Sequence, residues 1–95
     1  MKRELCFTDK ASEMLLLTSL FIENKFSRPH ADKFVDKAYK TFSVLIQQPF
    51  IFKASSFDEE IRIGIINKNC SFYYQVQESK ILILFLWDNR QESII

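Results

Sequence analysis

An arginine and a carboxylate follow the last apolar segment of this chain, and they are the residues best suited to bind a phosphate group. The run of apolar residues 81–87 leads directly into Asp88, Asn89, Arg90 and Gln91. The planar guanidinium of arginine binds oxyanions through two parallel hydrogen bonds, and a neighbouring carboxylate such as Asp88 could orient Arg90. The competing interpretation is a surface ion pair at a strand end, worth about 0–1 kcal/mol. The spacing alone favours the ion pair.

A second candidate site surrounds the only glycine. Side chains alternate across a strand, and in the strands predicted below this places Arg62, Gly64, Tyr73 and Gln75 on the face away from the helices. A glycine inside a strand usually marks a bend or the close approach of another group. Gly64 beside Arg62 and across from Tyr73 therefore indicates a shallow open site. An ordinary bulge in a curved sheet would explain Gly64 at least as well.

The other reactive residues have structural interpretations. His30, the only histidine, falls in the first turn of a predicted helix, where the helix dipole disfavours its charged form; we predict an exposed helix-start residue. The three acids at positions 58–60 precede a strand and are typical of a solvated loop. Cys6 and Cys70 lack the spacing of a metal site or a redox pair, so we expect two buried thiols in a reducing cytoplasm. We predict no metal site and no cofactor.

Two helices and four strands must position these groups. Thr8 and Ser27 are suited to cap helices, and apolar residues recur at helical spacing after each of them. Pro29 is tolerated in a first turn, and Pro49 ends the second helix. The predicted helices cover residues 9–25 and 27–47, and the predicted strands cover residues 5–7, 61–66, 70–76 and 81–87. Short turns make the last three strands an antiparallel meander. This order predicts a two-layer α+β fold, with an antiparallel helical hairpin packed on a mainly antiparallel sheet.

Alternation along the strands predicts which side chains meet the helices. The two rows expected to pack against them are Ile61, Ile63 and Ile65, and Phe72, Tyr74 and Val76. In the last strand both rows are apolar: Ile81, Ile83, Phe85 and Trp87 form one, and Leu82, Leu84 and Leu86 form the other. A helix pair covers only one face of a sheet, so the second row needs another cover.

An uncovered apolar row is typical of a partner site. We predict that a protein partner binds at Leu82, Leu84, Leu86 and Trp87. The alternative is that the loop of residues 50–57, which contains Phe50, Phe52 and Phe57, folds over this row. The pattern favours the partner only slightly.

Length and charge limit the classes of function. The chain of 95 residues suffices for one domain, residues 1–95, which buries roughly two-thirds of its unfolded-chain surface. The formal net charge of +1 argues against general nucleic-acid affinity. The apolar run of residues 14–22 is shorter than the ~20 residues that a membrane span needs, and the first residues do not resemble a signal peptide. We expect a cytoplasmic domain that does not contact the membrane.

The ordered combination of motifs resembles the RelE/ParE superfamily of bacterial toxins. Phe72-Tyr73-Tyr74-Gln75-Val76 resembles the family's Tyr-Tyr strand, and residues 87–91 (Trp-Asp-Asn-Arg-Gln) resemble its closing motif. Ile61-Arg62-Ile63 resembles the arginine-bearing strand, and Gln47-Gln48-Pro49 resembles the end of the second helix. The resemblance covers nearly the whole chain. It implies a type II toxin that arrests growth until a cognate antitoxin neutralises it, in a toxin–antitoxin hetero-oligomer.

The resemblance leaves the cellular target open between two branches. One branch cleaves mRNA on the ribosome with basic residues on the concave sheet face and a late Tyr or His; the matching catalytic candidates here are Arg62, Tyr73 and Arg90. The other branch poisons DNA gyrase and lacks that set. No Tyr, His or Lys follows Arg90, so we slightly favour the gyrase-type action over the endonuclease. A third hypothesis is an inert binding module or homodimer that uses the leucine row.

Overall fold

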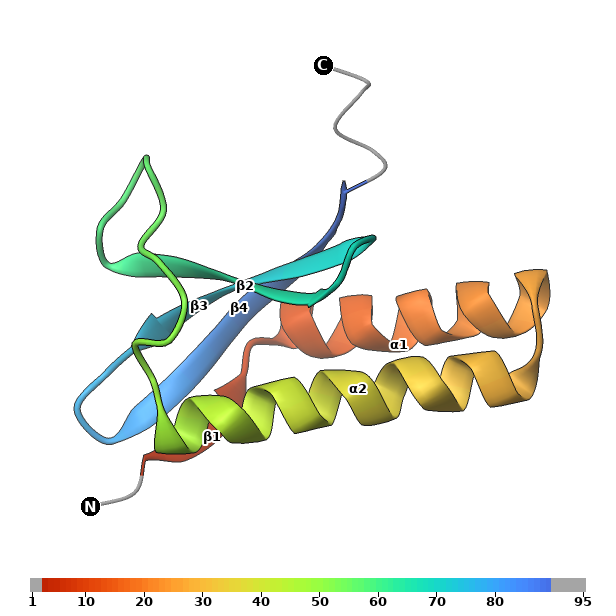
Figure 1. Cartoon of the computed structure of the whole chain (residues 1–95), viewed down its shortest axis with the longest axis horizontal. Helices are drawn as coiled ribbons and strands as arrows, with labels where there is room; N and C mark the ends of the chain where they lie inside the picture. Colours follow the sequence, from red (N-terminus) through yellow and green to blue (C-terminus); the bar gives the residue numbers. More distant parts are fainter. Residues whose placement is uncertain (1–2, 90–95) are drawn as a thin grey trace.

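The chain folds into a helical hairpin packed on one face of a four-stranded sheet (Figure 1). The computed structural model describes residues 3–89. The elements in chain order are β1 (Glu4–Phe7), α1 (Asp9–Lys25), α2 (Arg28–Gln47), β2 (Ile61–Asn67), β3 (Cys70–Val76) and β4 (Lys80–Asp88). The predicted two-layer α+β fold is confirmed, and every predicted helix and strand is present.

Thr8 starts α1 and ties it to the sheet. Its hydroxyl oxygen accepts a hydrogen bond from the backbone N–H of Ala11 at 3.0 Å, and its hydroxyl donates to the carbonyl of Leu84 in β4 at 2.5 Å. Asp9 in the first turn and Lys25 in the last turn complement the helix dipole. The predicted cap is confirmed, and the same side chain fixes the helix against β4.

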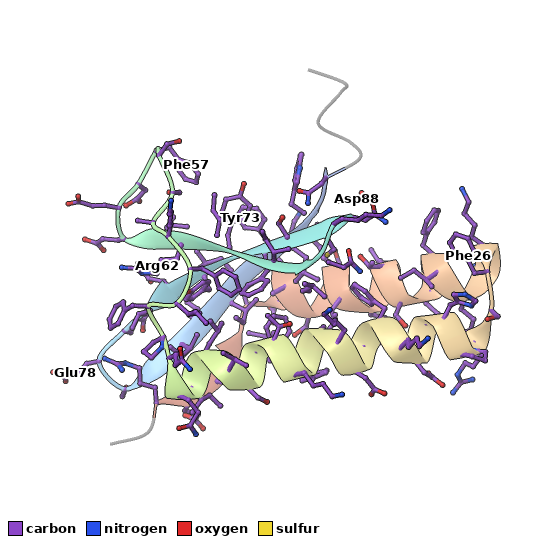
Figure 2. The ribbon with its side chains drawn as sticks, viewed as in Figure 1. Phe26, Phe57, Arg62, Tyr73, Glu78 and Asp88 are labelled. Atoms are coloured by element: carbon purple, nitrogen blue, oxygen red, sulfur yellow. The ribbon has the colours of Figure 1, made fainter. Side chains whose placement is uncertain are left out.

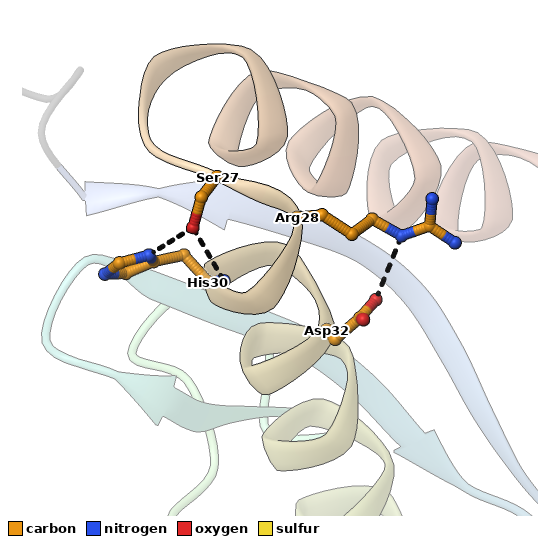
Figure 3. Close-up of polar contacts among 4 residues, drawn as sticks. All are labelled: Ser27, Arg28, His30 and Asp32. Carbon is orange, nitrogen blue, oxygen red and sulfur yellow. Dashed lines mark hydrogen bonds and ion pairs between the residues drawn. The ribbon is translucent and has the colours of Figure 1, made fainter.

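Ser27 starts α2 in a similar way (Figure 3). Its hydroxyl oxygen accepts a hydrogen bond from the backbone N–H of His30 at 3.4 Å and lies 2.7 Å from Nδ1 of the same residue. Arg28 and Asp32, one turn apart, form an exposed ion pair at 3.5 Å. His30 is exposed at the start of the helix, as predicted.

The core lies between the helical hairpin and the inner face of the sheet, and α1 contributes Ala11 and Leu15 to it. The buried residues of α2 recur at helical spacing and are Ala31, Phe34, Ala38, Phe42 and Leu45. The ring of Phe42 lies 5.4 Å from that of Phe7 in β1 and 5.0 Å from that of Phe72 in β3, both in edge-on geometry. Edge-on aromatic pairs stabilise a fold by more than the hydrophobic gain from the area that they bury. These two contacts therefore hold α2 against both β1 and β3.

β1 is an edge strand that runs parallel to β4, which gives the strand order β1-β4-β3-β2. The sequence alone does not fix this position. Two contacts hold β1 to the turn between β3 and β4: the backbone N–H of Glu4 donates to the carbonyl of Ser79 at 3.0 Å, and Nε of Arg3 donates to the carbonyl of Gln77 at 2.7 Å. The antiparallel meander of β2, β3 and β4 is as predicted.

In β2, the side chains predicted to face the helices face away from them, and those predicted to face away lie on the helix side. Gly64 lies opposite Phe72 and Arg62 lies opposite Tyr74, so both residues are on the side of the sheet that meets the helices. The cause is steric, because a Cβ atom on residue 64 would lie 2.2 Å from the ring of Phe72. The isoleucine row faces the other way, and Ile65 is 56% exposed. Gly64 therefore serves core packing, and the prediction that it belongs to an open site is wrong.

A β-bulge in β4 reverses the faces of that strand as well. Tyr73 pairs with Phe85 and Tyr74 pairs with Ile83, so one extra residue, Leu84, stands between the two pairs. The side chains that face the helices are Ile81, Ile83 and Leu86, and those that face away are Leu82, Phe85 and Trp87. The predicted rows are therefore wrong beyond the bulge. Leu86 is 1% exposed and belongs to the core, so it cannot contact a partner beside Leu82 and Trp87.

The loop between α2 and β2 packs on both sides of the sheet. The ring of Phe52 lies 6.0 Å from that of Phe72 on the inner side, while the ring of Phe57 lies 6.0 Å from that of Tyr73 on the outer side. Of the three loop phenylalanines considered as a cover, Phe57 is the one placed against the outer face. The loop thus covers that face only in part.

Candidate functional site

The face of the sheet turned away from the helices is apolar and aromatic. We call it the open sheet face, and its members are Phe57, Ile63, Ile65, Tyr73, Gln75, Leu82, Phe85 and Trp87. The ring of Tyr73 is stacked on that of Phe85, with centroids 4.5 Å apart and planes inclined by 19°. Figure 2 shows Tyr73 and Phe57 on the side of the sheet away from the helices. Tyr73 is therefore the centre of this surface.

The open sheet face carries little charge. β3 contains no charged residue, and the one charged residue of β2, Arg62, faces the helix side. In β4 the charged residues, Lys80 and Asp88, stand at the two ends of the strand. Exposed apolar patches mark sites of protein contact, whereas binding of a nucleic-acid backbone depends on Lys and Arg. The composition of this surface suits a protein partner.

Arg62 holds the loop before β2 against the strand. Its Nη1 donates a hydrogen bond to the carbonyl of Phe52 at 2.7 Å, and its guanidinium lies 4.8 Å from the centre of the Phe50 ring. Arg3 approaches the same ring at 5.9 Å, and such cation–π contacts are attractive. Arg62 also pairs with Ala54 in an isolated bridge. These contacts give Arg62 a structural role.

The three catalytic candidates do not come together within the described residues. Arg62 and Tyr73 lie on opposite faces of the sheet. Arg90 lies outside the residues that the structure describes. Asp88, which was predicted to orient Arg90, is half-buried and lines a groove beside α2. Of the predicted catalytic residues, Tyr73 is the one that the structure places on the open sheet face.

Asn89, in the closing motif, joins the end of β4 to the turn between β2 and β3. Its Oδ1 accepts a hydrogen bond from the hydroxyl of Ser71 at 3.1 Å, and its Nδ2 donates to the carbonyl of Lys68 at 3.3 Å. Its backbone N–H donates to the carbonyl of Asn69 at 2.9 Å. An amide at this position can make both side-chain contacts because it carries a donor and an acceptor.

The two tyrosines of the Tyr-Tyr strand have different environments. Tyr74 faces the core, and its hydroxyl donates to the carbonyl of Pro49 at 2.9 Å. Burial raises the pKa of the Tyr74 hydroxyl above its ordinary value, although a backbone hydrogen bond and the charge of Arg62 act in the opposite direction. Tyr74 is therefore a neutral structural residue, and Tyr73 is the partly exposed member of the pair.

Metal binding, cysteine chemistry and membrane insertion find little support in the described residues. Between residues 3 and 89, no group of three or more His, Cys, Asp or Glu side chains could hold a metal ion. Cys70 is buried as predicted, but Cys6 is partly exposed. Neither helix in this part of the chain combines the length and the apolar character needed to cross a membrane.

The sequence prediction turned Ile63 and Ile65 toward the helices and put Phe85 in one row with Ile81 and Ile83. The structure places Ile63, Ile65 and Phe85 on the open sheet face. The prediction of faces from alternating side chains holds only for a regular strand. The bulge at Leu84 interrupts β4, and no glycine or proline in that strand signals it. For β2 a signal was available, because Gly64 provides space for a large ring on the neighbouring strand. Matching that space to Phe72 would have set the register.

Comparison with known proteins identifies the fold through structure. No protein-family model matches the sequence, and no significant match is found among curated proteins. A chain of the chromosomal ParDE TA (toxin–antitoxin) system from P. aeruginosa has a TM-score of 0.79 and 19% sequence identity, over 92% of this chain and 96% of that chain. A chain of the E. coli DinJ-YafQ toxin-antitoxin complex has a TM-score of 0.66 and 8% identity, over 95% and 96%. YafQ from E. coli strain BL21(DE3) has a TM-score of 0.64 and 10% identity, over 99% of each chain. The chain has the RelE/ParE-like fold.

Proposed function

We propose that this chain is the toxin of a type II toxin–antitoxin system, and that it inhibits bacterial growth through contact of its open sheet face with a protein target in the cytoplasm. Its fold is that of chains from the ParDE and DinJ-YafQ toxin–antitoxin systems, which supports this class. The cognate antitoxin is the implied partner. The observation that carries the proposal is the uncharged aromatic surface around Tyr73, with Arg62 on the opposite side of the sheet.

Action by protein contact favours a gyrase-type toxin over a ribosome-dependent endonuclease. Cleavage of RNA by attack of the ribose 2′-OH requires groups that neutralise the charge of the phosphate during the reaction. The strands β2 and β3 present no such group on the open sheet face. An apolar, aromatic surface instead resembles the centre of a protein interface, where aromatic side chains are enriched and charges are depleted.

Induced expression in a bacterial host tests the proposal with a matched pair of variants. Ile65 on the open sheet face and Leu17 on α1 are both 56% exposed, so Ile65→Glu and Leu17→Glu introduce the same charge at equal exposure on different surfaces. We expect the wild type and Leu17→Glu to arrest growth, and Ile65→Glu to relieve the arrest. Thermal unfolding of the purified proteins must first show that both variants fold.

The nucleic acids of the arrested cells identify the target. Broken chromosomal DNA with intact mRNA is the expected outcome for a gyrase poison. No arrest by the wild type would contradict the proposal and would favour the inert binding module or homodimer. Equal relief by both variants would also contradict it, because the effect would then not belong to the open sheet face.

The endonuclease remains the second candidate because Tyr73 is on the open sheet face, where a phenol could contact RNA. Under this hypothesis, mRNA that is being translated in the arrested cells is cleaved, and primer extension locates the cuts. Tyr73→Phe and Arg90→Ala would each abolish the cuts and relieve the arrest. Uncut mRNA during arrest by the wild type would exclude this candidate.

A further inference from the structure

The first helix, α1, is apolar both on the side that meets the core and on its outer side. Ala11 and Leu15 belong to the core, whereas Leu16, Leu17 and Leu20 are 59%, 56% and 44% exposed. We call these three leucines the α1 ridge. A surface helix normally carries polar residues on its outer face, and a helix that is apolar all round is normally covered. The half of α1 next to the hairpin tip extends beyond the sheet (Figure 1), so another molecule can approach it without meeting the sheet.

The exposed side of α1 has the spacing of a coiled-coil seam. Alternating steps of three and four residues connect five exposed side chains, which are Lys10, Glu13, Leu17, Leu20 and Asn24. This is the heptad spacing with which one helix packs lengthwise against another. The two leucines stand at the centre of the seam, and the polar side chains stand at its ends. The seam is therefore suited to a second helix with an apolar centre and polar ends.

The charges of α1 fit a second copy of the same helix in antiparallel orientation. When Leu17 of one copy lies opposite Leu20 of the other, the same register brings Glu13 beside Asn24 and Lys25 of the other copy. The contact occurs twice, because a twofold interface is isologous. Within residues 3–89 neither Glu13 nor Lys25 has an ion-pair partner in its own chain. A parallel pair would instead place Glu13 beside Glu13 and Lys25 beside Lys25, and it would align the two helix dipoles.

We propose that a second copy of this chain binds at the α1 ridge, in a twofold homodimer with antiparallel α1 helices. The interface is on α1 and not on the leucine row of β4, whose Leu86 is buried. The open sheet face is on the other side of the sheet from the helical hairpin, so the dimer leaves it uncovered in both copies. One helix pair buries less than the roughly 1,200–2,000 Å² of a stable interface. We therefore expect a dimer that forms at micromolar concentrations and dissociates on dilution.

The first test measures the mass of the purified full-length protein by sedimentation equilibrium over a range of concentrations. Leu20→Glu places a charge in the centre of the seam. Its control is Val44→Glu on α2, because the two side chains are 44% and 40% exposed and both belong to helices. We expect the wild type and Val44→Glu to dimerise with affinities that agree within about twofold, and Leu20→Glu to remain monomeric, since the centre of an interface carries most of its binding energy.

Charge reversal tests the antiparallel register and identifies the occupant as a second copy. Glu13→Lys and Lys25→Glu each place like charges side by side at both ends of the seam, so each should weaken the dimer by about tenfold. The double variant Glu13→Lys/Lys25→Glu restores opposite charges and should recover most of the wild-type affinity. Twelve residues separate the two positions, which is roughly 18 Å along one helix, so the recovery cannot come from a contact within one copy. Both side chains are exposed, and thermal unfolding checks that all variants fold.

Three outcomes would overturn the dimer. A wild type that stays monomeric at its highest soluble concentration would exclude it, and the ridge would then be left to a different protein partner. Equal dimerisation of Leu20→Glu and Val44→Glu would place the interface elsewhere on the molecule. A double charge variant that is no tighter than the single variants would exclude the antiparallel register. Growth arrest enters none of these outcomes, so failure of the proposed function would leave the dimer intact, and failure of the dimer would leave the toxin assignment intact.

Discussion

Gly64 and Phe72 form a complementary pair across β2 and β3, because the Phe72 ring occupies the space where a side chain at residue 64 would begin. A Cβ atom on residue 64 would lie 2.2, 2.5 and 2.7 Å from three atoms of that ring. The ring cannot easily move aside. Phe72 is fully buried, and the rings of Phe42 and Phe52 contact it edge-on at 5.0 and 6.0 Å.

Gly64→Ala should therefore destabilise the fold by about 1–3 kcal/mol, the usual range for overpacking a core. Urea unfolding of the purified proteins measures the change. In the background of Phe72→Leu the smaller side chain leaves space for the added methyl group, so the same substitution should cost less. A cost that is equal in both backgrounds would show that the Phe72 ring does not set the requirement for glycine.

The helices could be predicted from the sequence because their boundaries depend on local chemistry. Thr8 and Ser27 satisfy free N–H groups of the residues that follow them. The apolar spacing of α2 then gives its buried stripe. None of these features requires knowledge of a distant residue, and the predicted boundaries agree closely with the structure.

The faces of the strands could not be predicted in this way, because both rows of β4 are apolar and either could enter the core. The bulge at Leu84 decides the choice, and it arises from pairing with β3 and with Thr8, whose side chain bonds the Leu84 carbonyl. In β2 the isoleucine row has the larger apolar area and was therefore predicted to enter the core. The side of β2 that carries Gly64 faces the core instead, because only there does the Phe72 ring find space. The candidate site inherited these errors, since Arg62 and Phe85 changed sides.

Removal of Arg62 should loosen the loop before β2 and leave toxicity per folded molecule intact. Arg62→Gln deletes a charged donor to the Phe52 carbonyl, and loss of such a bond costs about 1.5–3 kcal/mol. Hydrogen exchange at the amide of Ser55, which bonds the carbonyl of Ile61 at 2.7 Å, should become faster. Arg28→Gln is the control, because its ion pair is exposed and contributes about 0–1 kcal/mol. Loss of growth arrest in a stable Arg62→Gln protein would contradict the structural role and favour the endonuclease.

Thr8→Ala should destabilise the protein more than loss of an ordinary surface hydroxyl. The substitution removes the cap of α1 and the bond to the Leu84 carbonyl, and loss of a cap alone costs about 0.5–2 kcal/mol. Thr8→Ser keeps both contacts and should recover most of the stability. Thr41→Ala is the control, since the Thr41 hydroxyl donates to the Lys37 carbonyl within the same helix. Equal losses at positions 8 and 41 in thermal unfolding would contradict the link between α1 and β4.

The burial of Tyr74 predicts a loss of stability in alkaline solution. Its pKa in the folded protein is raised above the unfolded value of 10.0, so above that pH the folded state holds a proton that the unfolded state has released. The stability that comes from keeping the buried Tyr74 hydroxyl neutral is thus fully present below pH 10.0. It is lost as the pH rises through the pKa of Tyr74 in the folded protein. The free energy of unfolding of the wild type, measured from pH 8 to pH 11.5, should therefore decline more steeply above about pH 10 than that of Tyr74→Phe.

Tyr74→Phe also loses the hydrogen bond to the Pro49 carbonyl, so it should be less stable than the wild type at neutral pH. The informative quantity is the difference between the two curves, which should narrow as the pH rises. Tyr73→Phe is the matched control, because Tyr73 faces the open side of the sheet and its hydroxyl makes no hydrogen bond to another residue between positions 3 and 89. A constant difference between the wild type and Tyr74→Phe across this pH range would mean that burial does not restrain the ionisation of Tyr74, and that its hydroxyl is reached by solvent.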